Sequence, residues 1–206
     1  MRIARRACST MRFNHPNGLS RIDRSPPIGR RAAAFIRLLC GLMLFLMLAP
    51  AHAGPSEYDL KAAFIHNIAK FVEWPAAPHT SGILKLCVLG QNPFGNALDA
   101  LRDKQIGGLN WEIAPANSRT NLKECGVLFI AASENGNLRQ ILDGIKGSTV
   151  LTLGDTDGYA EQGVMVNFYL DDNKVRFEIN LEPASRAGLK ISSKLIRVGK
   201  MVDTPK

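Results

Sequence analysis

The sequence predicts a single compact α/β domain, built as a layered sheet with flanking helices and a C-terminal β-hairpin. Three observations predict it. Continuous apolar runs, typical of strands buried on both faces, alternate with segments of helical period up to about residue 153. Two further apolar runs, separated by a short polar turn, then follow each other directly. Residues 54–206 have the length of one domain and contain no repeat or low-complexity tract.

Residues 1–53 are expected to form a secretory signal peptide with an extended basic start. Its apolar run, residues 38–49, is shorter than the ~20 residues that a membrane-spanning helix needs. Ala51, His52 and Ala53 follow as a small-x-small cleavage site, which favours cleavage before Gly54 over an uncut N-terminal anchor. The domain of residues 54–206 is therefore expected to work outside the cytoplasm.

The positive charge of the chain is concentrated in this leader. The whole chain carries a formal charge of +8, and residues 1–53 hold nine arginines against one acidic residue, Asp23. Residues 54–206 contain 17 basic and 17 acidic side chains, so the domain itself is neutral. Because a nucleic-acid-binding domain needs a basic surface to neutralise phosphates, no nucleic acid is expected among the partners.

The first element of the domain is expected to be an amphipathic helix over residues 56–73. Ser56 and Asp59 resemble a capping box at its start, and Pro75 ends it. Apolar residues recur through it at helical spacing. They are Leu60, Ala63, Phe64, Ile68, Phe71 and Val72.

Strands and short helices alternate after this helix. The expected strands are residues 83–90, 109–114, 126–131 and 149–153. A short helix is expected to open at Asn92 and Pro93, and a helical turn at 121–124. Ser133 is expected to cap a longer helix that ends at Gly147. This order is typical of a sheet built from βαβ units.

Residues 164–170 and 175–181 are expected to pair as a hairpin at the edge of the sheet. The second strand alternates apolar and polar residues, so one of its faces should be wetter. Phe168 and Tyr169 are neighbours in the first strand, so one of the two must point away from the core. A closing helix is expected to start at Pro183.

A search for catalytic constellations favours a binding protein over an enzyme. The segment 90–95 lies where a dinucleotide fingerprint would, but it lacks the glycine spacing. His66 and His79 have no nucleophile near them in sequence. Asp155, Asp157 and Glu161 are expected to form a polar turn; the alternatives are a weak cation loop and a ligand-contacting loop at the carboxyl end of the sheet. No cofactor and no metal ion are expected.

The domain contains two cysteines, Cys87 and Cys125. In an oxidising compartment a disulfide is the favoured state, and it would close a loop worth roughly 4 kcal/mol in chain entropy. The alternative is a pair of buried free thiols that pack as small apolar side chains. A thiolate metal site lacks the required ligand spacing.

Several blocks of the domain together resemble one family in order and spacing. They are residues 71–75 (Phe-Val-Glu-Trp-Pro), 86–90, 125–130, 175–181 and 187–195. This pattern resembles the YfiR-like periplasmic proteins. The resemblance implies an α/β sandwich that often forms homodimers, and repression of a membrane diguanylate cyclase through the periplasmic part of that cyclase. It matches Cys87 and Cys125 to one of the family's two cysteine pairs, while the second pair is absent here.

Two classes of function follow from these expectations. The first is a periplasmic repressor that binds an inner-membrane signalling protein and lowers cyclic-di-GMP, with Trp74, Phe168 and Tyr169 as candidate partner-binding residues, whichever are exposed. The second is a periplasmic small-molecule-binding protein with a pocket at the carboxyl end of the sheet. An exposed apolar patch would support the first class, and a deep pocket with polar groups the second.

Overall fold

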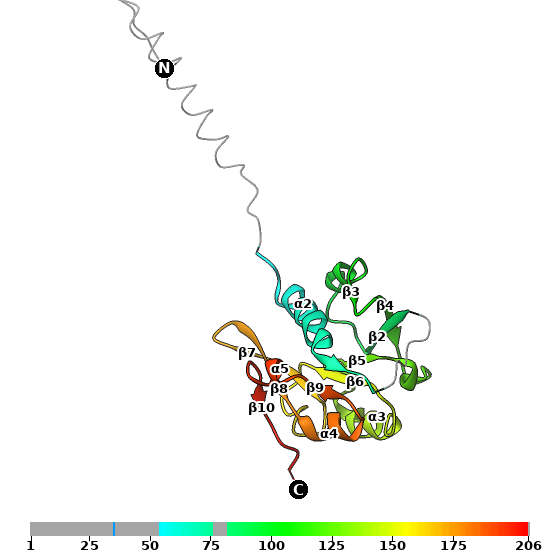
Figure 1. The fold of residues 1–206 in the computed structure, drawn as a ribbon. Helices are drawn as coiled ribbons and strands as arrows, with labels where there is room; N and C mark the ends of the chain where they lie inside the picture. Colours follow the sequence, from blue (N-terminus) through cyan, green and yellow to red (C-terminus); the bar gives the residue numbers. More distant parts are fainter. Residues whose placement is uncertain (1–34, 36–53, 76–81, 206) are drawn as a thin grey trace, which may run out of the picture. The chain divides into compact units, whose positions relative to one another are not determined.

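The computed structural model describes residue 35 and residues 54–75 and 82–205 (Figure 1). The last two ranges belong to one compact unit, Ala53–Lys206. The signal peptide expected over residues 1–53 lies, apart from Phe35, outside the described residues. The domain is the α/β fold that the sequence predicts, with a mixed sheet of eight strands flanked by helices.

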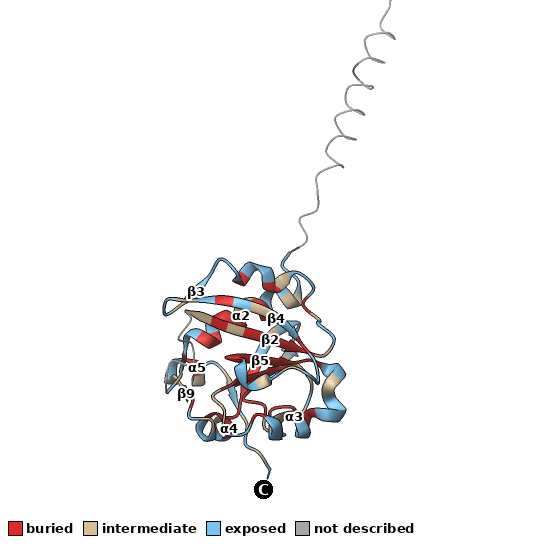
Figure 2. Ribbon diagram, turned by 90° about the vertical axis from the view of Figure 1, so that its right-hand side faces the viewer, coloured by how far each residue is buried: buried red, intermediate tan, exposed pale blue. Residues whose placement is uncertain are grey.

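The strand order of this sheet is β10-β8-β7-β6-β5-β2-β4-β3, and β4, β2, β5, β6 and β7 run parallel to one another. The strands are β2 (Ile83–Leu89), β3 (Gln105–Ile106), β4 (Leu109–Ala116), β5 (Val127–Ile130), β6 (Leu151–Gly154), β7 (Val166–Asp171), β8 (Lys174–Ile179) and β10 (Lys200–Met201). The central strands are apolar on both faces because helices cover both faces. Figure 2 shows the buried residues gathered in these strands.

The two faces of the sheet carry separate apolar clusters. On one face α2 (Glu57–Lys70) packs through Ile65 and Ile68 against β2, β5 and the hairpin. On the other face α3 (Leu138–Gly144) packs through Leu138 against a cluster that contains both cysteines. Two short helices close the chain, α4 (Leu181–Arg186) and α5 (Ser193–Ile196).

The first helix is shorter than predicted, and it is buried on a different face. The capping box is confirmed: Ser56 Oγ accepts from Asp59 N, and the Asp59 side chain accepts from Ser56 N. The helix ends at Lys70, because β1 (Val72–Glu73) leaves it to pair with β9 (Lys190–Ile191). Leu60 is 40% exposed while its neighbour Lys61 is 3% exposed, so the polar residue occupies the buried position.

The predicted helices after β2 and β5 are largely replaced by 3-10 turns. The first is a 3-10 helix, Ala97–Leu101, and the second begins as a 3-10 segment, Ala132–Asn137, before α3. The polar, glycine-containing stretch before Leu138 has low α-helical propensity, which accounts for the late start. Ser133 is not the cap of α3; its hydroxyl accepts from Gln91 N in the neighbouring loop.

The hairpin is formed as predicted, by antiparallel pairing of β7 with β8. Its turn residues Asp172 and Asn173 both have positive φ, as a two-residue turn of the mirror-image type requires. The hairpin is not the outermost element, because β10 pairs with the end of β8. The face of β8 predicted to be wetter is partly buried: Glu178 is 8% exposed and Asn180 is inaccessible.

Candidate functional site

The loops that follow β2, β5 and β6 meet at the carboxyl end of the parallel strands. Gly90 follows β2 with φ +89°, and a Cβ there would lie 2.4 Å from Ser133 Oγ. Only glycine therefore fits where the loop after β2 approaches the loop after β5. Gln91 N donates to the same Ser133 Oγ at 2.9 Å. This end of a parallel sheet is where ligands usually bind in open α/β folds.

A buried ion cluster occupies the adjoining space. Lys61 Nζ lies 2.8 Å from Asp155 Oδ2 and 2.5 Å from Glu57 Oε1, and the Tyr58 hydroxyl donates to Asp155 at 3.0 Å. The ammonium also stands 4.4 Å from the centre of the Tyr58 ring. Four side chains from α2 and the loop after β6 therefore form one network, which ties the first helix to the sheet.

Burial and hydrogen bonding oppose each other in this cluster. Burial alone would lower the pKa of Lys61, but hydrogen bonds to Asp155 and Glu57 outweigh it, so its pKa is raised and the side chain stays charged. Burial, and then the Asp155 charge, raise the pKa of Tyr58. The cation is thus held between two carboxylates, and the arrangement offers no free nucleophile or base.

The hollow beside this cluster is small. It measures about 280 Å³ and is lined by Tyr58, Gln91, Asn92, Pro93, Ala131, Ala132, Ser133 and Asp155. Ligand pockets usually begin near ~300 Å³. The Asp155 carboxylate forms its ion pair with Lys61. Among the residues that the structure describes, no group of three or more His, Cys, Asp or Glu side chains is placed to hold a metal ion. A larger hollow lies at the other end of the strands.

The two cysteines form a disulfide, which confirms the favoured state. The Cys87 and Cys125 sulfurs are 1.92 Å apart and the Cα atoms 5.9 Å apart. Cys87 lies in the middle of β2, and Cys125 two residues before β5, with both side chains buried in the cluster under α3. The bridge therefore fastens two neighbouring central strands on one face of the sheet.

The three candidate partner-binding residues have different environments. Phe168 is 1% exposed and its ring lies 6.4 Å from that of Phe64, so it belongs to the core and does not meet the condition of exposure. Trp74 is half-buried and packs against the same core. Tyr169 is the outward member of the hairpin pair, half-buried, with Lys200 Nζ 5.7 Å from its ring centre.

Tyr169 lies on the hairpin face opposite to that of Phe168, which packs against Phe64 of α2. Arg176 is its cross-strand partner, and Glu178 and Lys200 continue the row across β8 and β10. Lys200 Nζ bonds Glu178 Oε1 at 2.8 Å. We refer to Tyr169, Arg176, Glu178 and Lys200 as the hairpin face. Of its four residues, Tyr169 and Arg176 belong to types that are enriched at protein interfaces.

His66 is a buried side chain of α2 whose role is structural. Its Nδ1 accepts from Trp111 Nε1 at 3.1 Å, so the neutral imidazole connects the helix with β4. Burial, and then the charges of Lys104 and Lys70, lower its pKa below the ordinary value of 6.5. His79 lies outside the described residues.

Comparison with known proteins decides the family. The model of the YfiR/HmsC-like family matches residues 58–200, which is most of the domain. The chain belongs to the YfiR/HmsC-like family. The matched range includes every element from the second residue of α2 to the first residue of β10, and both cysteines.

Two solved structures are similar to this family member at low identity. A conserved domain protein from Vibrio cholerae O1 biovar El Tor superposes with a TM-score of 0.51 at 12% identity, over 73% of this chain and 60% of that chain. An ABC domain in complex with L-Trp from Streptococcus pneumoniae has a TM-score of 0.47 at 9% identity, over 70% of this chain and 60% of that chain. The chain thus spans about 60% of the length of each, and the first likeness speaks for the fold alone.

Sequence reasoning missed the ion cluster around the buried Lys61. Asp155 was expected to lie in a polar turn, and nothing in its own neighbourhood predicts that it reaches Lys61 on α2. The available signal was the i,i+4 pair Glu57 and Lys61, which is usually an exposed pair. In the described part of the chain, no helix is both long and apolar enough to span a membrane.

Proposed function

We propose that this protein is a periplasmic regulator that binds the outward-facing part of an inner-membrane diguanylate cyclase and holds the cyclase in an inactive conformation. Membership of the YfiR/HmsC-like family is the observation that carries the proposal. The Cys87–Cys125 disulfide fits the oxidising compartment that the proposal requires. The domain then acts by binding, without turnover of its own.

Repression in this proposal is a difference in affinity between two states of the partner. A domain outside the membrane has no access to the cytoplasmic nucleotide pool, so its influence passes through the partner's transmembrane helices. A ~100-fold shift toward the inactive state requires about 2.7 kcal/mol tighter binding to that state. Contacts of this size are usually concentrated in a few aromatic or long side chains.

The hairpin face is the surface we assign to this contact, with Tyr169 at its centre. Tyr169 and its cross-strand partner Arg176 are residue types that often carry binding energy at interfaces, and the Lys200 ammonium lies over the Tyr169 ring. Trp74 is a second candidate because it is half-exposed, whereas Phe168 is withdrawn because the core encloses it. A homodimer, which the family resemblance implies, would have to leave the hairpin face accessible.

Cyclic-di-GMP measured in intact cells tests the proposal. Deleting the gene should raise the cyclic-di-GMP level, and the exported protein should restore the original level. The same domain expressed without its first 53 residues should fail, because it stays on the wrong side of the membrane. Full restoration by the leaderless protein would refute the periplasmic mechanism. The exported Tyr169→Ala variant should restore less than Phe71→Ala, a control at an exposed aromatic residue away from the hairpin.

A second candidate function is small-molecule binding in the service of another membrane sensor. The observation that favours it is the larger hollow of about 780 Å³, which lies within the usual size range of ligand sites. It lies at the amino ends of β6 and β7, whereas the sequence places the expected pocket at the carboxyl end, where the hollow measures about 280 Å³.

A further inference from the structure

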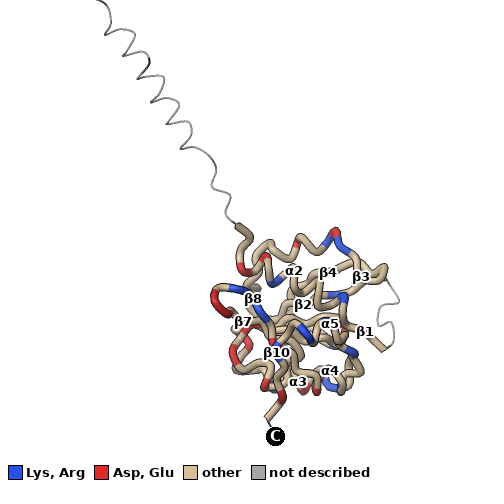
Figure 3. Tube along the Cα trace, turned by 60° about the vertical axis from the view of Figure 1, so that its left-hand side comes forward, with Lys and Arg blue, Asp and Glu red and all other residues tan. Residues whose placement is uncertain are grey.

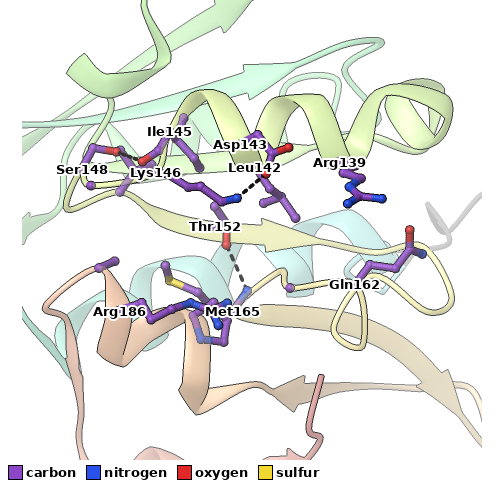
Figure 4. Close-up of a pocket in the computed structure, with 15 residues that line it drawn as sticks. Arg139, Leu142, Asp143, Ile145, Lys146, Ser148, Thr152, Gln162, Met165 and Arg186 are labelled. Atoms are coloured by element: carbon purple, nitrogen blue, oxygen red, sulfur yellow. Dashed lines mark hydrogen bonds and ion pairs between the residues drawn. The ribbon is translucent and has the colours of Figure 1, made fainter. Parts of the chain in front are cut away.

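The larger hollow is a groove between α3 and α4. Its walls come from the end of α3 and the turn after it, from the beginning of β6, from the segment leading into β7, and from α4 (Figure 4). The two helices lie side by side at one end of the domain in every view (Figures 1 and 2). The groove has a volume of about 780 Å³. Neither the disulfide nor the hairpin face takes part in it.

The floor of the groove is apolar. The side chains that form it come from four separate segments, and they are Leu142, Ile145, Val150, Met165, Pro183 and Ala187. Two hydroxyl side chains also line the groove, and both are hydrogen-bonded within the chain. Thr152 is 1% exposed, and its Oγ accepts from Met165 N at 3.0 Å, while Ser148 Oγ donates to Ile145 O. An apolar ligand segment that binds there would remove apolar surface from water, which is a main source of affinity for a small molecule.

The rim of the groove carries an excess of positive charge. Arg139, Lys146 and Arg186 line it, against the single acid Asp143. Lys146 pairs with Asp143 at 2.6 Å and Arg186 with Glu182 at 2.5 Å. Within residues 54–75 and 82–205, no carboxylate lies within ion-pair distance of Arg139. The domain as a whole is neutral, and Figure 3 shows basic and acidic residues interspersed along the chain, so the rim of the groove is more positive than the domain on average.

We propose that the groove binds a small amphipathic anion, with an aliphatic body on the apolar floor and a carboxylate or similar headgroup held by Arg139 and Arg186. The apolar floor selects for an aliphatic body, because buried hydrocarbon contributes about 25 cal/mol per Å². The cationic rim selects for the anion, since a guanidinium fork matches a carboxylate geometrically. The proposal concerns binding, and it holds whether or not the protein represses a cyclase.

Three probes with the same ten-carbon chain separate the two contributions. Decanoate, decanol and decyltrimethylammonium, each below its micelle concentration, are titrated into the purified protein by calorimetry. Decanoate should bind at one saturable site at least about tenfold more tightly than decanol, which corresponds to one charge-assisted contact. Decyltrimethylammonium should bind most weakly. Equal affinities for the three probes, or no saturable binding of decanoate, would overturn the proposal.

Two matched variants place the site. The double variant Arg139→Gln and Arg186→Gln should weaken decanoate binding about tenfold and leave decanol binding unchanged. Arg102→Gln removes a similar exposed charge, paired with Asp99 outside the groove, and should change neither. Ala187→Phe, which fills part of the floor, should weaken both probes. Circular dichroism confirms that each variant is folded; unchanged decanoate affinity in a folded double variant would refute the assignment.

Discussion

At the carboxyl end of the parallel strands the Lys61 ammonium is almost fully buried between two carboxylates of its own chain, whereas at the amino end three basic side chains stand exposed around an apolar groove. The first arrangement is complete: every charge has its partner inside the domain. The second is incomplete, because no carboxylate of the described residues lies within ion-pair distance of Arg139. The contrast separates charges that hold the fold from charges that remain available to a ligand.

The largest effect is expected from breaking the buried pair. Asp155→Ala leaves the buried Lys61 with Glu57 alone, and the loss of one partner of a buried pair usually costs 3–5 kcal/mol. Because Glu57 remains, we expect a loss of about 3 kcal/mol in the free energy of unfolding, measured by urea denaturation.

The control for this variant lies two residues away. Asp157→Ala removes an exposed carboxylate from the same loop and should change stability by less than about 0.5 kcal/mol. If Asp155→Ala is no less stable than Asp157→Ala, the carboxyl-end cluster contributes little and the contrast between the two ends disappears.

The disulfide should have the next largest effect, because it fastens the two strands whose loops meet at the carboxyl end. Replacing Cys87 and Cys125 together by alanine should lower stability by about 2–4 kcal/mol, as is typical for native bridges. Adding reductant to the unmodified protein should reproduce most of this loss, and the double variant should not respond to reductant. If the double variant, the reduced parent and the oxidised parent all have the same free energy of unfolding, the bridge does not stabilise the domain.

The third prediction concerns pH and the neutral polar pair of His66 on α2 and Trp111 on β4. Since the folded-state pKa of His66 lies below 6.5, the folded protein binds fewer protons than the unfolded chain between that lowered pKa and 6.5. The contribution of His66 is therefore complete above pH 6.5 and is lost as the pH falls through the folded pKa. Protonation also removes the acceptor for Trp111 Nε1.

Stability curves of the parent and of His66→Gln isolate this effect. Their difference should be constant above pH 6.5 and should shrink below it, because glutamine does not titrate. A difference that stays constant down to pH 5 would show that His66 does not titrate differently in the folded state. Lys61, whose pKa is raised, should contribute nothing in this range.

The sequence predicted the fold better than it predicted the sites. Continuous apolar strands, glycine punctuation and the Asp172-Asn173 turn are local signals, and they placed the order of the elements and the hairpin correctly. Helix ends were predicted less well: the pairing of β1 with β9 ends the first helix early, and this pairing joins segments more than a hundred residues apart. Local pattern carries no information on such a contact.

The polar features could not be read from local pattern for the same reason. Lys61 is buried in place of Leu60 because Asp155, 94 residues later, supplies a counter-charge, and a helical wheel assigns charged residues to solvent by default. The disulfide could be predicted from the sequence, because the domain has only two cysteines and the leader indicates an oxidising compartment. The groove was not, since its basic residues come from two helices that meet only in the folded domain.

The smallest effect on stability is expected at the groove, and it completes the contrast. Arg139→Gln removes an exposed guanidinium that has no ion-pair partner in the described residues, so the free energy of unfolding should change by less than about 0.5 kcal/mol. Its effect should emerge only with ligand. Decanoate at ten times its dissociation constant should stabilise the parent by about 1.4 kcal/mol, and the variant by clearly less at the same concentration. A charge that stabilises the fold affects the free energy of unfolding even without ligand. A large loss of stability in ligand-free Arg139→Gln would therefore show that Arg139, like the carboxyl-end cluster, serves the fold.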